Sequence, residues 1–294
     1  MKEIETAMST QLLIGEALKY AVHNVPNREA VIYEQERLTY RELFKRSKKI
    51  VNWLQEQGIG RDDKVGCLFK NGIPFVELYF GTSMNGSVFV PINFRLVSQE
   101  VAYILNNSDV KILFIEEEFS SVIEPIVNQL PQIIKIVVVG EVNTELAADV
   151  ISYSSIFQTS ASYNSPQNLS DDDAHVIIYT SGTTGRPKGA VLTHKNLYIN
   201  AMNKLYHTKS ERGTKHLIIP PLFHIAALSL LVQNCLMEGT SIIQREFQPI
   251  RLLETIENEK VNSMFLVPAM WNQLFEVPNL SNYDVSSMVN CSTG

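Results

Sequence analysis

The sequence predicts an α/β protein with two lobes of mostly parallel sheets flanked by helices. The first observation is that short apolar stretches alternate along the chain with longer amphipathic ones, as strands and helices do in such folds. The second is that the short stretches are apolar at nearly every position, which is typical of strands covered on both faces. The third is the length of 294 residues, which favours two lobes over one compact domain.

The first half of the chain begins with a helix over residues 39–58. Thr39 and Glu42 have the spacing of a capping box, and Gly58 is placed to end the helix. The pattern then predicts, in order, strand 64–69, helix 74–84, strand 87–91, helix 99–108 capped by Ser98, strand 110–115, helix 120–130 and strand 133–140. Residues 141–173 are rich in Ser, Asn and Asp and poorly periodic, so we expect them to cover the surface.

The second half continues the alternation. It predicts strand 175–180, a helix after the N-cap Thr193, strand 216–220, helix 224–239, strand 240–244, helix 249–260, strand 261–268, helix 269–277 and strand 287–294. We expect residues 1–60 and 194–294 to form one α/β lobe and residues 61–193 to form the other. The first lobe should be incomplete, and its open sheet edge should lead to self-association as a homo-oligomer or to a loosely ordered C-terminal end.

The composition excludes several classes of protein. Hydrophobic residues make up 45% and charged residues 19%, as in globular chains, and the net charge of −6 argues against nucleic-acid binding. The three cysteines, Cys67, Cys235 and Cys291, lack metal-site spacing, and we expect buried thiols in a reducing compartment. No apolar run is long enough for a signal peptide or an integral membrane segment, so the default location is the cytoplasm.

The chemistry is concentrated in the stretch TSGTTGRPKG, residues 180–189. Glycines let the main chain approach a ligand closely, and successive backbone N–H groups can form an anion-binding nest. The stretch supplies three glycines, four hydroxyls and two cations: Gly182, Gly185, Gly189, Thr180, Ser181, Thr183, Thr184, Lys188 and Arg186. A cradle for a polyphosphate fits this set better than the alternative, a flexible hydrophilic hairpin. The spacing differs from that of the P-loop, which has four residues between its glycines.

The longer stretch YTSGTTGRPKGAVLTH closely resembles the phosphate-binding signature of the adenylate-forming superfamily. That superfamily contains acyl-CoA synthetases, aryl-CoA ligases, beetle luciferases and the adenylation domains of peptide synthetases. PLFH, residues 221–224, lies at the expected distance downstream, and VPINFRL, residues 90–96, is similar to the acyl-CoA synthetase branch. The resemblance covers essentially the whole chain.

The resemblance implies a reaction and a set of site residues. ATP would activate a carboxylic acid as an acyl-adenylate, releasing pyrophosphate, and the thiol of coenzyme A would then displace AMP. The residues implied to hold the β- and γ-phosphates are Thr180, Ser181, Gly182, Thr183, Thr184, Gly185 and Lys188, with Thr183 also near Mg²⁺. His224 would lie beside the acyl carboxylate and the α-phosphate, so Lys188 and His224 are the expected catalytic residues. The alternative for His224 is a helix-start histidine bonded to backbone.

Other polar residues are expected to have structural roles. We expect His194 to help a helix begin, and His175, His207 and His216 to lie on the surface or in packing. The three consecutive carboxylates Asp171, Asp172 and Asp173 face different directions in any extended or helical chain, so a solvated run is favoured over a metal site. Trp53 and Trp271 lie on amphipathic stretches and are expected in the core.

The resembled enzymes are much longer than this chain. We therefore expect the N-terminal portion of an acyl-CoA ligase, with the magnesium carboxylate, the ribose-binding Asp and a catalytic lysine beyond it. The apolar residues Ile225, Ala226, Ala227 and Leu228 favour a fatty acid as the carboxylic acid. One alternative is a phosphate-binding module that is inactive on its own. Another is an adenylation domain that loads a carrier protein, although VPINFRL favours the coenzyme A ligases.

Overall fold

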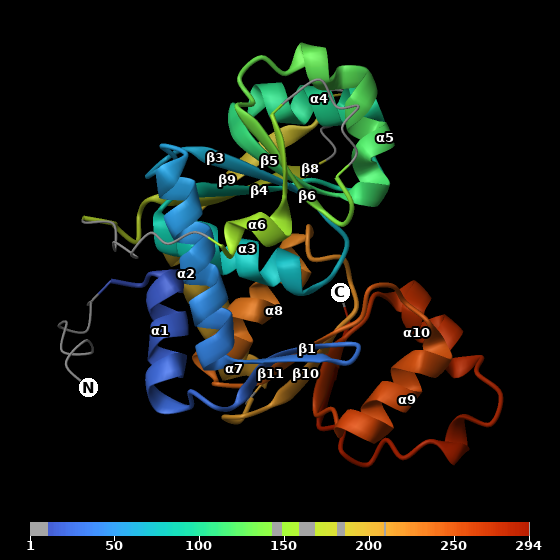
Figure 1. The fold of residues 1–294 in the computed structure, drawn as a ribbon. Helices are drawn as coiled ribbons and strands as arrows, with labels where there is room; N and C mark the ends of the chain where they lie inside the picture. The colour runs from blue at the N-terminus through green and yellow to red at the C-terminus, as the bar shows by residue number, and fades with distance from the viewer. Residues whose placement is uncertain (1–10, 143–148, 159–167, 181–185, 209, 294) are drawn as a thin grey trace.

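The computed structural model describes residues 11–142, 149–158, 168–180, 186–208 and 210–293. They form two mostly parallel sheets with helices between and outside them, so the expected α/β class is confirmed (Figure 1). Each sheet has an antiparallel pair at one edge, and all the other strand pairings among the described residues are parallel.

The six-stranded sheet is built from the two ends of the chain. Its strands, in spatial order, are β13 (Asn290–Ser292), β12 (Ser263–Phe265), β10 (Lys215–Ile218), β11 (Thr240–Ile243), β1 (Glu29–Tyr33) and β2 (Glu36–Thr39). The early strand β1 pairs in parallel with the late strand β11, with Ile32 opposite Ile242. The long separation of these partners shows that the N-terminal segment completes a sheet formed mostly by residues after 214.

The seven-stranded sheet is built from the middle of the chain. Its order is β7 (Val150–Ser152), β6 (Lys135–Val139), β5 (Val110–Glu116), β3 (Lys64–Leu68), β4 (Val88–Pro91), β8 (Ala174–Thr180) and β9 (Lys188–Thr193). The strand β7 lies within residues 141–173, a segment that was expected to cover the surface and in which no strand was predicted. Three residues are too short to show a period, which is why the pattern did not reveal the strand.

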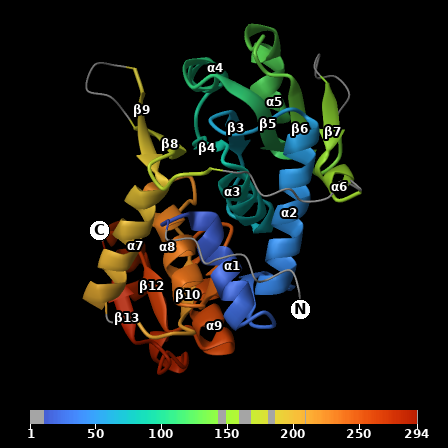
Figure 2. The same ribbon diagram turned by 90° about the vertical axis from the view of Figure 1, so that its left-hand side faces the viewer.

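The helices form three layers around the two sheets (Figure 2). The middle layer holds α1 (Ile14–Asn24), α2 (Tyr40–Glu56), α3 (Ile73–Asn85), α7 (His194–Thr208) and α8 (Ile225–Leu236), which share one core with both sheets. The outer layers hold α4 (Ser98–Asn107) and α5 (Ser120–Ile123) on the seven-stranded sheet, and α9 (Pro249–Glu259) and α10 (Pro268–Phe275) on the six-stranded sheet. Because the middle core is shared, the division into separate lobes at residues 61 and 193 stays a prediction.

Burial explains the composition of the middle helices. Along α3 nearly every residue is buried, because the helix is covered from both sheets and by α1 and α2. Its one carboxylate, Glu77, is fully buried, pairs with Arg46 and accepts a hydrogen bond from the Tyr153 hydroxyl at 2.5 Å. On α2 the expected capping box is confirmed, with the Thr39 side chain accepting from the Glu42 amide and the Glu42 carboxylate accepting from the Thr39 amide.

Several local expectations need correction. Val97 rather than Ser98 precedes α4, and its amide donates to the Glu100 carboxylate at 3.1 Å. Residues 120–130 form the short α5 followed by the 3₁₀ helix Glu124–Gln129, because Pro125 breaks the run. Cys67 and Cys235 are buried, but Cys291 is exposed since it lies on the edge strand β13. A further 3₁₀ helix, Glu117–Phe119, follows β5, and another, Leu280–Asn282, precedes β13.

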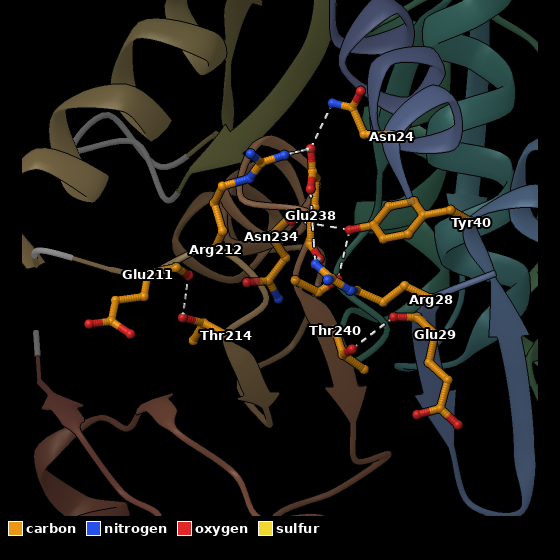
Figure 3. A network of polar contacts seen from close by, with 11 residues as sticks. Asn24, Arg28, Glu29, Tyr40, Glu211, Arg212, Thr214, Asn234, Glu238 and Thr240 are labelled. Atoms are coloured by element: carbon orange, nitrogen blue, oxygen red, sulfur yellow. Dashed lines mark hydrogen bonds and ion pairs between the residues drawn. The ribbon is translucent and has the colours of Figure 1, made fainter. Parts of the chain in front are cut away.

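The C-terminal end of α8 is fixed by a polar network around Glu238 (Figure 3). The buried Glu238 carboxylate accepts from the Asn24 amide at 2.8 Å and pairs with Arg212, while its backbone oxygen accepts from Arg28 at 2.8 Å. The Tyr40 hydroxyl donates to two backbone carbonyls at the same helix end, at 3.1 and 2.7 Å. The network therefore ties α8 to α1, to α2 and to the chain before β10.

Among the residues that the structure describes, no helix combines the length and the hydropathy that crossing a membrane would need.

Candidate active site

The glycine-rich stretch connects the antiparallel strands β8 and β9. Thr180 is the last residue of β8, Lys188 is the first residue of β9, and their Cα atoms are partners in the register. Ser181, Gly182, Thr183, Thr184 and Gly185, which were predicted to bind phosphate, lie outside the described residues. The part that is described is therefore a β-hairpin that holds the two ends of the predicted phosphate loop beside each other.

The loop end of this hairpin packs against α4. The Tyr179 hydroxyl donates to the Asn107 side chain at 2.7 Å, and the Tyr103 hydroxyl donates to the Pro187 carbonyl at 3.3 Å. The Arg186 guanidinium lies over the Tyr103 ring, 5.7 Å from its centroid. Lys188 is exposed and makes no hydrogen bond or ion pair with any described residue. Of the two cations, Arg186 is engaged with α4 and Lys188 is available for an anion.

Gly189 has a packing role within the hairpin. Its backbone does not adopt a positive φ. A Cβ at this position would lie 2.8 Å from the Ile177 Cγ2 atom and 3.1 Å from the Tyr179 ring. Glycine therefore provides space for side chains of β8, not an unusual backbone angle.

His224 lies in the connection between β10 and α8, at the position directly before the helix. Its backbone carbonyl accepts from the amides of Ala227 and Leu228 at 3.1 and 3.0 Å, and its side chain makes no cap hydrogen bond. The alternative of an imidazole bonded to the helix backbone is therefore not what the structure shows. The residue reaches solvent, and its ring packs 4.2 Å from the Phe223 ring, centroid to centroid.

The surroundings of His224 favour a neutral imidazole. Partial burial of the ring lowers its pKa from the ordinary value, and the positive charge of Arg95 lowers this pKa further. The chain before Arg95 also approaches this turn, because the Phe94 ring meets the Phe223 ring edge-on at 5.3 Å. A neutral imidazole carries one N–H group, and this group can donate a hydrogen bond to an anion.

Among the described residues, no hydrogen bond, ion pair or ring contact joins Lys188 to His224. Each instead lies next to the segment that runs from the end of β4 into α4. Phe94 of this segment packs against Phe223, the charge of Arg95 lowers the pKa of His224, and Tyr103 of α4 donates to Pro187 at the exit of the hairpin loop. The VPINFRL stretch indicated a resemblance but no role for Arg95. Its place directly after a buried strand was the signal that could have found it.

Asn71 is a second residue that the sequence analysis missed. It follows β3 and is buried, and its side chain makes four hydrogen bonds to the chain between β10 and α8 and to the end of β11. Its position after a strand was again the only sequence signal, since nothing in a single sequence reveals partners about 150 residues away.

Ion pairs join the two sheets beside Asn71. Arg245, after β11, pairs with Glu116 at 2.5 Å and with Glu118, while Lys70, after β3, pairs with Glu118 at 2.9 Å and Glu246 at 3.0 Å. The carboxyl ends of strands from both sheets therefore meet here, and open α/β sheets bind ligands at such ends.

The remaining histidines are in packing or on the surface. His194 is the first residue of α7, and it is also buried and stacks on His175 at 4.3 Å, a contact that the sequence did not predict. His216 is also buried and His207 is exposed, within the roles expected for them. Of the carboxylates at 171–173, Asp173 pairs with Arg61 at 2.5 Å and Asp172 with Lys195 at 3.5 Å.

No group of three or more His, Cys, Asp or Glu side chains that could hold a metal ion occurs within the described ranges.

The fold and the hairpin define an α/β domain of the adenylate-forming class. The profile of the AMP-binding enzymes matches residues 18–294, and the chain belongs to this family, in its acyl-CoA ligase branch. The chain is 32% identical over 266 residues to a feruloyl-CoA synthase of an Amycolatopsis species, covering 90% of this chain and 50% of that protein. It is 31% identical over 282 residues to the fatty acid–[acyl-carrier-protein] ligase ScoC of Streptomyces coeruleorubidus, covering 95% and 52%.

A solved structure agrees with this assignment. The inhibitor-bound N-terminal domain of FACL13 from Mycobacterium tuberculosis superposes with a TM-score of 0.84 at 27% identity, covering 96% of this chain and 69% of that one. The chain spans about half the length of the curated relatives it matches.

Proposed function

We propose that this chain is the N-terminal portion of an ATP-dependent acid–coenzyme A ligase. In the proposed reaction a carboxylate attacks the α-phosphorus of ATP, the bond to pyrophosphate breaks, and the resulting acyl-adenylate passes its acyl group to the thiol of coenzyme A with release of AMP. The observation that carries the proposal is the TSGTTGRPKG stretch at a hairpin whose cation Lys188 is left unpaired by the described residues. Membership in the AMP-binding family supports it.

We propose that the hairpin binds the phosphates that leave as pyrophosphate. Thr180, Ser181, Gly182, Thr183, Thr184 and Gly185 would donate backbone and hydroxyl hydrogens, and Lys188 would add a full charge. Negative charge grows on the leaving pyrophosphate during the attack, and donors fixed in advance stabilise it without further reorganisation. Lys188 is exposed and has no carboxylate partner among the residues that the structure describes, which supports this role, because an ammonium group already paired to a carboxylate would have to give up that partner.

His224 is proposed to orient the attacking carboxylate. Its imidazole makes no cap hydrogen bond, and its lowered pKa keeps it neutral near pH 7, so its N–H can donate to a carboxylate or α-phosphate oxygen. Arg95, whose charge lowers that pKa, would attract the same anions to the site. The two side chains together offer a hydrogen bond and a positive charge.

Magnesium was expected near Thr183, which lies outside the described residues. The described residues contain no cluster of three or more side chains suited to a metal ion, and they do not by themselves fit one. No step of the proposed reaction is therefore derived through magnesium.

A fatty acid is the acyl substrate we favour. Of the four apolar residues proposed to line the pocket, Ala227 and Leu228 are fully buried in the middle core, whereas Ile225 is 37% exposed. Ile225 and the half-buried Ala226 are therefore the ones placed to meet an acyl chain beside His224. Neither carries a charge that could pair with the ammonium group of an amino acid.

The test measures acid-dependent ATP–pyrophosphate exchange in a protein that carries this chain together with the remaining half found in its relatives. The panel contains fatty acids of several lengths, ferulate and amino acids. We expect Lys188→Ala to lower kcat/KM for ATP by about 10- to 150-fold, which corresponds to about 1.5–3 kcal/mol for a hydrogen bond to a charged group. His224→Ala should lower the exchange rate while leaving the fold intact.

Matched controls separate these effects from general damage. Lys195→Ala removes an exposed lysine a few residues further along the chain, where it pairs with Asp172. His207→Ala removes an exposed histidine from α7. Exchange that is normal in Lys188→Ala, or lowered equally in Lys195→Ala, would contradict the phosphate role. A normal rate in His224→Ala, or an unfolded variant, would return His224 to a structural role.

Transfer to a carrier protein is the second candidate, and the similarity to ScoC favours it. The two candidates share the adenylate and differ in the thiol that receives the acyl group. Supplying coenzyme A and a phosphopantetheinylated carrier protein in parallel assays distinguishes them by which thioester forms. The 294-residue chain on its own is expected to bind ATP without exchange, and exchange by the chain alone above its Lys188→Ala variant would refute that expectation.

A further inference from the structure

We propose that Asn71 is a positioning residue that fixes the position of His224 relative to the hairpin proposed to bind phosphate. The two predicted catalytic residues belong to different sheets. Lys188 begins β9 of the seven-stranded sheet, whereas His224 follows β10 of the six-stranded sheet. A site made of both requires that the distance between the sheets be fixed at the point where His224 lies. This inference rests on the proposed function.

The side chain of Asn71 reaches from one sheet to the other. Its amide nitrogen donates to the backbone carbonyls of Ile219 at 3.1 Å, Pro220 at 3.2 Å and Gln244 at 3.1 Å. Its oxygen accepts from the Leu222 amide at 2.8 Å. Asn71 itself lies in the loop between α3 and β3, and β3 belongs to the same sheet as the hairpin. One buried side-chain amide is thus hydrogen-bonded both to the segment after β10 and to the residue after β11.

The turn that Asn71 holds is the one that ends at His224. The His224 amide donates to the Pro221 carbonyl at 3.0 Å, so Leu222 lies inside a tight turn whose last residue is His224. The other end of α8 is held by the Glu238 and Tyr40 network, which does not involve the seven-stranded sheet (Figure 3). Of these two anchors, only Asn71 sets the position of His224 relative to the hairpin.

An amide is the group that this place requires. Three carbonyls converge on one atom of the side chain and one N–H on the other, so the group must donate at one end and accept at the other. An aspartate of the same shape would direct a carboxylate oxygen at three carbonyl oxygens. Buried donors and acceptors left unmatched cost free energy, and the turn would move to recover partners.

Asn85 provides a matched control. It is the last residue of α3, at the opposite end of the same helix, and it is as buried as Asn71. Its amide nitrogen donates to the Ile59 carbonyl at 3.1 Å and the Ser87 hydroxyl at 3.3 Å, and neither partner belongs to the turn before α8. Asn85→Asp therefore imposes a similar buried mismatch without touching the His224 turn.

The first experiment uses the 294-residue chain and follows the His224 imidazole by NMR as pH is varied. We expect Asn71→Asp to shift the His224 ring signals and to move its titration towards that of a solvated histidine, whereas Asn85→Asp leaves both unchanged. Asn71→Ser, whose hydroxyl can replace part of the bonding, serves where the aspartate variant does not fold and should show a smaller shift. Identical His224 signals in wild type and Asn71→Ser would overturn the proposal.

The second experiment uses the longer ligase and measures exchange per folded molecule. We expect Asn71→Asp to lower kcat by about 10- to 100-fold with little change in KM for ATP, as for a misplaced catalytic group. Equal losses in Asn71→Asp and Asn85→Asp would mean a merely structural role. If the wild-type ligase shows no exchange with any acid, the proposed function fails, while the NMR comparison still decides whether Asn71 positions His224.

Discussion

Acid should destabilise this chain through its buried histidines, and His194 offers the sharpest test. His194 begins α7, is 1% exposed and stacks on His175 with ring planes 12° apart. Its Nδ1 atom accepts from the Ile14 amide at 3.4 Å, so this nitrogen carries no proton in the folded chain. Its Nε2 atom and both ring nitrogens of His175 have no partner within the described part of the chain. A second proton on His194 would therefore break a hydrogen bond and bury a charge.

The direction and size of the effect follow from the pKa. Burial lowers the pKa of His194 from 6.5 to about 4, and the nearby carboxylates of Asp173 and Asp171 only partly oppose this shift. As pH falls, the unfolded chain takes up its proton first, so stability is complete above about pH 6.5 and is lost progressively towards about pH 4. Between about pH 7.5 and pH 5, the loss from this one group is about 2 kcal/mol. Burial also lowers the pKa of His216, to about 3, and the charge of Lys204 adds to this shift.

The assay is urea unfolding of wild type and His194→Asn at both pH values. Asparagine keeps an oxygen that can accept from the Ile14 amide but cannot take up the proton. We expect the acid-induced loss in the free energy of unfolding to be about 2 kcal/mol smaller in the variant, whatever its stability at pH 7.5. His207→Asn, on the exposed side of the same helix, should retain the full wild-type loss. An equal loss in wild type and His194→Asn would refute the reasoning.

Three further outcomes are expected. Glu238→Ala should lower the free energy of unfolding by about 1–3 kcal/mol in urea titration, because the Asn24 amide and the Arg212 guanidinium lose the buried carboxylate that they bind. Gly239→Ala should cost about 1–3 kcal/mol in the same assay, since a Cβ there would lie 2.4 Å from the Thr214 carbonyl oxygen, and an unchanged midpoint would contradict this contact. A thiol reagent should modify Cys291 quickly and the two buried cysteines only after unfolding, and Cys291→Ser should abolish the fast phase.

The sequence predicted the elements well wherever a period or a cap was long enough to read. The capping box of Thr39 and Glu42, the strand–helix alternation and Pro249 in the first turn of α9 are local features that one segment specifies by itself. The strand β7 was not predicted because three residues are too few to show an alternation of apolar and polar side chains. The exposure of Cys291 escaped because it depends on which strand forms the sheet edge, and that is decided by pairings between distant segments.

The candidate site was predicted by residue type but not by geometry. The stretch at 180–189 and the PLFH turn named Lys188 and His224, and the expected lobes assigned them to different parts of the chain, but neither motif indicated which side chains hold the two parts together. Arg95 and Asn71 were missed because their partners lie far along the chain. The contact of His194 with α1 was not predicted for the same reason, because it joins segments that are distant in the sequence.

The two-sheet arrangement explains why the positioning contacts lie outside the recognisable motifs. A motif within one hairpin can place its own donors, because neighbouring strands fix them through backbone hydrogen bonds. No backbone pairing joins the six-stranded sheet to the seven-stranded sheet in the described residues, so their relative placement depends on side chains and packing. Asn71 and the Arg245 ion pairs are such side chains, at the strand ends where His224 lies. Substitutions at these places should therefore change the geometry between the two predicted catalytic residues while leaving each sheet intact.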